Sequence, residues 1–160
     1  MNDIQRALGL GEFYHIGIAV REIDQGIGRL TAFGLTVGPV FDVLVPSQYR
    51  GANTEAGIRL AFAAAGPIAL ELVEPTAGES SVATSLRERG EGVQHFGYRV
   101  DDLEGTVAHA KELGIEAEWV VHDEHGLAVV FLAADAFFGV NLELVRKAPS
   151  VSLDFRQKSE

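Results

Sequence analysis

The sequence predicts an α+β fold in which one βαβββ module occurs twice. Three observations support this prediction. Two similar segments stand 80 residues apart, a second similar pair stands 72 residues apart, and apolar runs rich in β-forming residues lie between them. A duplication of this kind has to be identified before secondary structure is assigned, because it determines the fold of both halves.

The first pair of segments predicts a strand followed by a helix in each half. Residues 13–20 (FYHIGIAV) align with residues 93–100 (VQHFGYRV), and the match continues without a gap to Gly34 and Gly114. Charged residues open both predicted helices, and a glycine directly after the last apolar position is typical of a helix end. Each half therefore begins as a βα unit.

The second pair of segments predicts the strand that closes each half. Residues 68–73 (IALELV) and 140–145 (VNLELV) share the core Leu-Glu-Leu-Val. With these strands as the ends, we expect a first module at residues 13–75 and a second at residues 93–146, together forming a single domain within residues 1–160.

The remaining strands and turns follow from composition. Two β-rich runs separate the helix from the closing strand in each module, and a helix that begins near residues 79–81 connects the modules. Clusters of polar residues and glycine mark the turns. The strands are predicted at about 36–45, 57–64, 115–121 and 127–132, the turns at 51–57 and 122–126, and the connecting helix at 82–89.

Composition excludes several classes of function. The chain has 23 acidic and 13 basic residues and a formal net charge of -10, so we expect no nucleic-acid partner. No stretch reaches the length of about 20 apolar residues that a membrane span requires, and the N-terminus lacks a secretory h-region. The absence of cysteine excludes disulfides and thiolate ligands. We expect a cytoplasmic protein.

Four polar residues are predicted to share one face of the sheet. Side chains alternate along a strand, so Tyr14 and Ile16 are expected to pack against the helix while His15 points to the opposite face. The same alternation places His95, Glu71 and Glu143 on that opposite face. Each residue alone is equally well explained as a strand residue that faces water.

The repetition favours a metal site. Both modules present one histidine and one glutamate at matched positions, and Gly17 and Gly97 beside the histidines are expected to leave room for a substrate. Two imidazoles and two carboxylates suit one borderline or hard divalent ion, such as Co, Ni, Zn, Mn, Mg or Fe, with positions left for water or substrate. The predicted ligands are His15, Glu71, His95 and Glu143.

These residues resemble the vicinal oxygen chelate superfamily, which includes glyoxalases, dioxygenases and bleomycin-resistance proteins. The resemblance covers residues 13–146. Within the superfamily, the local sequence is closest to methylmalonyl-CoA epimerase-like members in three segments, residues 72–75 (LVEP), 86–92 (LRERGEG) and 95–102 (HFGYRVDD). It implies that the curved mixed sheets of two βαβββ modules form a metal-binding cup. The metal is then held by the same four residues, on the first and last strands of each module.

The resemblance implies an isomerase or epimerase that removes a proton α to a carbonyl of a small substrate, with an acyl-CoA as one class. Glu143, or its counterpart Glu71, is then the catalytic base, and the enzyme is expected to be a homodimer. A glyoxalase-like lyase and a non-catalytic protein that binds a small molecule, such as a drug, are the alternatives.

Three residues are candidates for binding the substrate. Arg99 is predicted to share the face of His95, where it either pairs with a substrate carboxylate or neutralises the acidic ligands. Arg59, on a middle strand, and Asn141, at the start of the last strand, are the other two candidates for the pocket.

Overall fold

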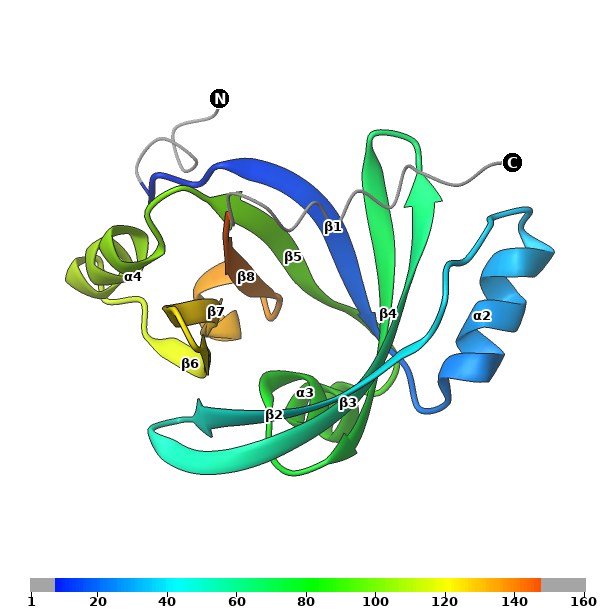
Figure 1. The fold of residues 1–160 in the computed structure, drawn as a ribbon, viewed down its shortest axis with the longest axis horizontal. Helices are drawn as coiled ribbons and strands as arrows, with labels where there is room; N and C mark the ends of the chain where they lie inside the picture. The colour runs from blue at the N-terminus through cyan, green and yellow to red at the C-terminus, as the bar shows by residue number, and fades with distance from the viewer. Residues whose placement is uncertain (1–7, 148–160) are drawn as a thin grey trace.

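The computed structural model describes residues 8–147 and confirms the predicted α+β fold class (Figure 1). The first module consists of β1 (Glu12–Ala19), α2 (Ile23–Ala32), β2 (Phe41–Tyr49), β3 (Ala52–Ala65) and β4 (Ile68–Ala77). Helix α3 (Ser81–Arg89) connects it to the second module, which consists of β5 (Gly92–Val100), α4 (Leu103–Glu112), β6 (Ala117–Asp123), β7 (Gly126–Leu132), the 3-10 turn η1 (Ala134–Phe137) and β8 (Asn141–Arg146).

The strands of both modules join into one closed barrel, in the order β1-β4-β3-β2-β6-β7-β8-β5. Within each module the first strand runs parallel to the last, β1 beside β4 and β5 beside β8. Two antiparallel pairings, β1 with β5 and β2 with β6, connect the modules. The four strands that carry the predicted ligands, β4, β1, β5 and β8, are therefore consecutive neighbours in the barrel.

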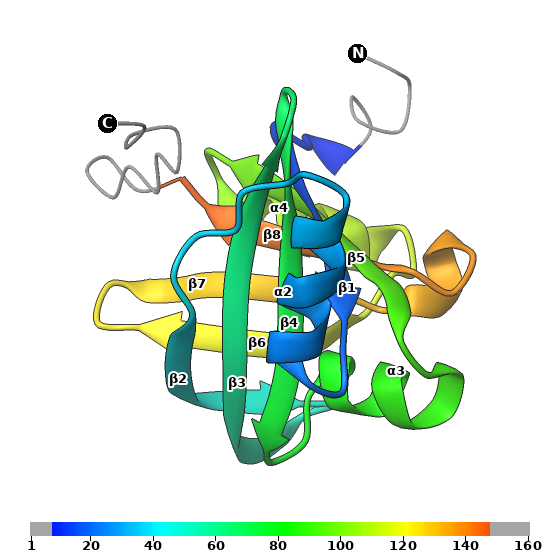
Figure 2. The ribbon, with the colours of Figure 1, turned by 90° about the vertical axis from the view of Figure 1, so that its right-hand side faces the viewer.

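Two helices cover the outside of the barrel, one for each module. Helix α2 lies across the outer face of the first module's strands, where Ile23 packs with Ala61 of β3 and Leu72 of β4 (Figure 2). Helix α4 packs Leu103 against β7 and β8 in the same way. Ile23 and Leu103 are completely buried, and burying a side chain of this size stabilises a fold by about 1.5–3 kcal/mol.

Helix α3 closes one end of the barrel. Its N-cap is Ser80, whose hydroxyl oxygen accepts a hydrogen bond from the Ala83 backbone nitrogen at 3.1 Å. Val82 of this helix packs with Trp119 and Phe131 from the second module. No helix within residues 8–147 is long and apolar enough to cross a membrane.

The predicted turn at residues 51–57 is wrong. Strand β2 continues to Tyr49 and β3 begins at Ala52, so the turn contains only Arg50 and Gly51. Both turn residues have positive φ angles, 49° and 79°, which match the right-handed twist of a two-residue hairpin. The polar residues after the turn are strand residues with exposed side chains, which composition alone does not distinguish from a loop.

The second predicted turn, at residues 122–126, is shorter than expected. Strand β6 includes His122 and Asp123, β7 begins at Gly126, and only Glu124 and His125 form the turn. As in the first module, exposed polar residues extend a hairpin and do not interrupt it.

Two glycines allow the modules to pack closely at the neighbouring strands β1 and β5. A β-carbon on Gly17 would overlap the imidazole ring of His95, and a β-carbon on Gly97 would overlap the ring of His15. Strand pairing places Gly17 opposite His95 and His15 opposite Gly97. The room beside each histidine, which the sequence assigns to a substrate, is filled by the histidine of the other module.

We expect Gly17→Ala and Gly97→Ala to destabilise the fold by about 1–3 kcal/mol, because an added methyl group overpacks a site with no free volume. Thermal unfolding of the two variants measures the loss. The matched control is Gly28→Ala, in α2, where an added β-carbon has no atom within 4 Å. This control is expected to raise stability by about 0.5–1 kcal/mol. Wild-type stability in both barrel variants would contradict the packing described here.

Candidate metal centre

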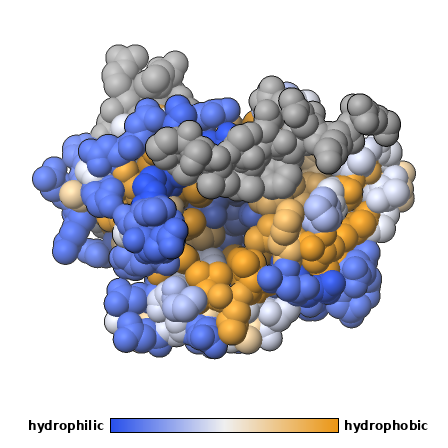
Figure 3. Space-filling model, viewed as in Figure 1, coloured by the Kyte–Doolittle hydropathy of each residue, from blue (hydrophilic) through white to orange (hydrophobic). Residues whose placement is uncertain are grey.

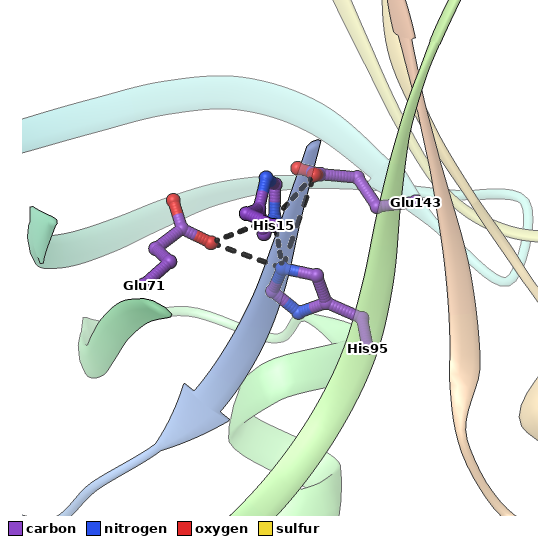
Figure 4. A group of neighbouring side chains, drawn as sticks. All are labelled: His15, Glu71, His95 and Glu143. Carbon is purple, nitrogen blue, oxygen red and sulfur yellow. Dashed lines mark hydrogen bonds and ion pairs between the residues drawn. The ribbon is translucent and has the colours of Figure 1, made fainter. Parts of the chain in front are cut away.

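The four predicted ligands meet inside the barrel (Figure 4). His15 comes from β1, Glu71 from β4, His95 from β5 and Glu143 from β8. All four are buried, and one ligand atom of each lies within 4.8 Å of the ligand atoms of the other three. In the part of the chain that the structure describes, no other group of three or more His, Asp or Glu residues has this arrangement.

The distances in this cluster are those of a coordination shell. The two Nε2 atoms of His15 and His95 are 2.8 Å apart. Glu71 Oε2 lies 2.9 Å from His95 Nε2 and 3.3 Å from His15 Nε2, and Glu143 Oε2 lies 3.0 and 3.8 Å from His15 and His95. Metal–ligand bonds of 2.0–2.2 Å separate neighbouring ligands by about 2.8–3.6 Å. The observed distances fall in and around this range.

Two atoms of the cluster lack hydrogen-bond partners among the described residues. These are His15 Nδ1 and Glu143 Oε2, both buried, and the second lies close to His15 without hydrogen-bond geometry. A buried polar atom without a partner costs about 1–3 kcal/mol. Converging nitrogen and oxygen lone pairs with an unpaired carboxylate oxygen fit a bound divalent ion, so the four residues are suited to the metal that the sequence predicts.

The charges in the cluster stabilise one another. Burial alone would lower the pKa of His15, but the negative charges of the Glu143 and Glu71 carboxylates raise it to about 10. Burial alone would raise the pKa of Glu71, and the charge and hydrogen bonds of His15, followed by those of His95, lower it well below its usual value. A proton on His15 therefore offsets part of the negative charge when no ion is bound.

Tyr14 departs from the predicted alternation. The pairing of β1 with β5 shifts by one residue between Phe13 and His15, which is a β-bulge at Tyr14. Phe13 takes the place expected for Tyr14, with its ring 5.2 Å from that of Tyr98 in the α4-facing layer. Because of the bulge, Tyr14 lies on the same side as its neighbour His15.

Tyr14 contacts the metal centre through Glu143. Burial, then the charges of Glu143 and Glu71, raise the pKa of the Tyr14 phenol well above its usual value, and a side-chain hydrogen bond with Glu143 adds to the increase. Tyr14 is therefore a neutral phenol next to this carboxylate. The prediction that it packs against a helix is wrong, and periodicity gave no signal for the bulge.

Arg99 lies behind Tyr14 and does not contact the four ligands directly. Its guanidinium stacks over the Tyr14 ring at 4.4 Å from the centroid and lies 3.9 Å from a carboxylate oxygen of Glu12. The side chain is about one-third exposed (30%). Arg99 is thus a partly solvated cation separated from Glu143 by one aromatic ring.

The structure does not bring Arg59 to the site. Arg59 lies on the outer face of β3, where its guanidinium is within 3.2–3.6 Å of carboxylate oxygens of Glu74, Asp42 and Asp24. Asp24 belongs to α2, which covers this outer face. Arg59 therefore links α2 to the strands through ion pairs. The prediction that Arg59 lines the pocket is wrong, because residue type alone does not show which face of a strand a side chain occupies.

Asn141 is close to the site, but the hydrogen-bonding groups of its side chain are paired with other residues of the protein. It is buried, and it donates to the Leu132 carbonyl oxygen at 2.7 Å and to Glu118 Oε2 at 2.8 Å. Its own oxygen accepts from Gln94 Nε2 at 2.6 Å. The predicted substrate contact is replaced by a structural network behind His95.

Two phenylalanines form a matched wall around the cluster. Phe62 pairs across the sheet with Glu71, and Phe131 pairs with Glu143. Their rings meet the histidines of their own modules edge-on, with centroids 6.0 Å apart for His15 and 5.1 Å for His95. Phe131 was missed by sequence reasoning, although the repeat of a phenylalanine in the strand before each glutamate strand is visible in the sequence.

Residues 14–131 match the family model for the Glyoxalase/Bleomycin resistance protein/Dioxygenase superfamily. The chain belongs to this superfamily. The match includes three of the four clustered residues, His15, Glu71 and His95, and covers most of both modules. No curated protein matches the chain significantly.

Solved structures of the superfamily include methylmalonyl-CoA epimerases that resemble this member. A variant of the Streptomyces coelicolor enzyme, in complex with 2-nitronate-propionyl-CoA, has 27% sequence identity, a TM-score of 0.65 and coverage of 88% of this chain and 96% of that chain. The enzyme from Mycobacterium tuberculosis has 25% identity, a TM-score of 0.61 and coverage of 88% and 90%. A hypothetical protein, BH1468 from Bacillus halodurans C-125, has 26% identity, a TM-score of 0.64 and coverage of 93% and 97%.

We expect this superfamily member to bind about one divalent ion per chain. His15→Ala and His95→Ala each remove a nitrogen ligand from the cluster, so both variants should lose most of the bound metal. Elemental analysis of purified protein after dialysis against a weak chelator measures the content. His109→Ala is the matched control, because His109 is partly exposed on α4 and pairs with Glu112. Wild-type metal content in both cluster variants would exclude the site.

Proposed function

We propose that this chain is a divalent-metal-dependent epimerase or isomerase that removes a proton α to the carbonyl group of a small substrate. The observation that carries the proposal is the pair of buried glutamates, which approach two histidines from opposite sides (Figure 4). The similarity to methylmalonyl-CoA epimerases, one of them in complex with an acyl-CoA analogue, makes an acyl-CoA thioester the leading substrate class.

The ion, when bound, supplies Lewis-acid stabilisation for the negative charge that develops on a carbonyl oxygen. The protein must supply the base. In the proposed reaction the α C–H bond breaks, its electron pair moves towards the carbonyl oxygen, and the proton passes to a carboxylate oxygen of Glu143. A proton from water then adds to the other face of the same carbon, and Glu143 releases the proton that it accepted to water, which gives the epimer and restores the carboxylate.

Glu143 is the better base of the two glutamates for a physical reason. Glu71 Oε2 lies within 3.3 Å of both histidines, and this pairing keeps its pKa low, so it is a weak proton acceptor. Glu143 makes one short contact, to His15, and one long contact of 3.8 Å. The looser carboxylate is the one that can exchange contact with the ion for contact with a proton.

The residues around Glu143 support the same assignment. The Tyr14 phenol hydrogen-bonds with this carboxylate, and Arg99 lies on the other side of the Tyr14 ring. Tyr14 therefore orients Glu143, while the partly exposed Arg99 is placed to attract an anionic part of a substrate, such as a phosphate or a carboxylate.

We expect Glu143→Gln to abolish proton exchange more completely than it weakens metal binding. A glutamine keeps an oxygen that can coordinate an ion, but its amide cannot accept a proton near neutral pH. The measurement is proton NMR in deuterated water with the metal-loaded protein, across methylmalonyl-CoA, other acyl-CoAs and α-hydroxy carbonyl compounds. Loss of general-base catalysis should lower exchange by about 10²–10⁴-fold.

Glu71→Gln is the matched comparison, because it changes the corresponding residue of the other module. Full exchange by metal-loaded Glu143→Gln would exclude Glu143 as the base, and full exchange by both variants would exclude the mechanism. Conversion of an added substrate by bond cleavage without exchange would favour a glyoxalase-like lyase. A wild-type protein with no affinity for divalent ions would favour non-catalytic binding of a small molecule.

We also propose that the protein is a homodimer. The first module exposes hydrophobic side chains on β2, including Phe41, Val43 and Leu44, and Figure 3 shows hydrophobic residues gathered on the lower and right part of one face. Apolar surface of this kind is commonly covered by a second copy. Light scattering should give twice the mass of one chain, and a monomer at micromolar concentration would contradict the proposal.

A further inference from the structure

A chain of buried amide side chains leads outward from His95. The ring atom Nδ1 of His95 lies 2.6 Å from Gln94 Oε1, and Gln94 Nε2 donates to Asn141 Oδ1 at 2.6 Å. Each of the three residues is 1% exposed. These contacts lie on the far side of the imidazole from Nε2, the atom that faces the other ligands.

The outer end of the chain determines the direction of every hydrogen bond in it. Asn141 Nδ2 contacts the backbone carbonyl of Leu132 and the carboxylate of Glu118, which can only accept. Burial would raise the pKa of Glu118, but hydrogen bonds from Arg50, Asn141 and Ser81 together lower it, so this carboxylate stays ionised. The nitrogen of the Asn141 amide therefore faces Leu132 and Glu118, and the amide oxygen must face Gln94.

The same reasoning continues inward to the histidine. Because Asn141 presents an oxygen, Gln94 must present its NH₂ group to Asn141 and its oxygen to His95. An oxygen 2.6 Å from Nδ1 requires a proton on that nitrogen. His95 therefore carries a proton on Nδ1, and Nε2, the atom on the side of the other three ligands, is the one that would bind the ion.

Among the described residues, the first module has no such chain. Strand pairing aligns His15 with Ala69 at the place where it aligns His95 with Asn141, and alanine has no polar side chain. The residue before His15 is Tyr14, which interacts with Glu143. His15 Nδ1 is buried and has no hydrogen-bond partner within residues 8–147.

We propose that Gln94 and Asn141 are positioning residues that make His95 the fixed ligand of the metal centre and leave His15 as the adjustable one. A ligating histidine is commonly oriented by a hydrogen bond at its second nitrogen, and loss of that bond typically lowers metal affinity by about 10- to 100-fold. The inference rests on the metal site of the proposed function but not on the proposed reaction, so it is tested without a substrate.

The experiment measures Zn²⁺ affinity and imidazole N–H exchange in the full chain. In zinc-loaded wild-type protein, the His95 Nδ1–H proton should exchange slowly with water, and that of His15 should exchange faster. Gln94→Met keeps the volume and removes the acceptor. It should lower Zn²⁺ affinity by about 10- to 100-fold in a chelator competition and remove the protection of the His95 proton.

Two further variants separate orientation from general packing. Gln94→Glu keeps an oxygen next to Nδ1 but places its second oxygen opposite Asn141 Oδ1, so it should recover part of the affinity that Gln94→Met loses. Tyr49→Phe deletes a comparable buried hydrogen bond, from Tyr49 to Thr84 at 2.9 Å, that does not reach His95, and should leave affinity and exchange unchanged. Wild-type affinity and slow exchange in Gln94→Met would overturn the proposal. So would a wild-type spectrum in which His15, and not His95, carries the protected proton, a result that requires no variant to fold.

Discussion

The reciprocal packing of two histidines on two glycines is the constraint on which the metal centre depends. Each imidazole occupies the space left by a missing side chain on the opposite strand, His15 over Gly97 and His95 over Gly17. Because β1 and β5 are antiparallel neighbours, this packing brings the two Nε2 atoms to 2.8 Å. The parallel partners β4 and β8 then bring one glutamate to each side. Alanine at either glycine would separate the histidines, and no rearrangement of the glutamates alone would restore the cluster.

The environment makes this cluster costly without an ion. Both carboxylates lie inside the closed barrel and are buried, and a buried carboxylate needs a compensating charge. The raised pKa of His15 is the response of the metal-free protein, since a proton on this imidazole supplies one positive charge. A divalent ion would supply more charge at the same place and would take the place of that proton. The four residues suited to hold an ion are thus also the ones that would gain most stability from it.

Much of this arrangement was predictable from the sequence, and the failures share one cause. The four predicted ligands follow from a two-residue period and an internal repeat, both of which can be read directly from the order of residues. The bulge at Tyr14 leaves no trace in that period, because one extra residue changes the face only where the partner strand is known. Arg59 and Asn141 were misassigned for a related reason. Their partners, such as Glu74 and Glu118, are distant in the sequence, and a polar side chain on a strand gives no sign of whether it pairs with protein or faces a pocket.

The duplicated halves have become unequal in the residues that support the ligands, while the ligands themselves remain the same. Behind His95 the second module has Gln94 and Asn141, and the corresponding places in the first module hold Tyr14 and Ala69. The second module combines two different properties, because it orients its histidine, His95, and also carries the glutamate with the looser contacts, Glu143. The proposed reaction needs both properties at once: ligands rigid enough to keep the ion in place and one carboxylate free enough to move a proton. A symmetric site would have to compromise between these requirements at every ligand. In this chain they are divided, since His95 and Glu71 have the fixed contacts and His15 and Glu143 retain the unpaired atoms.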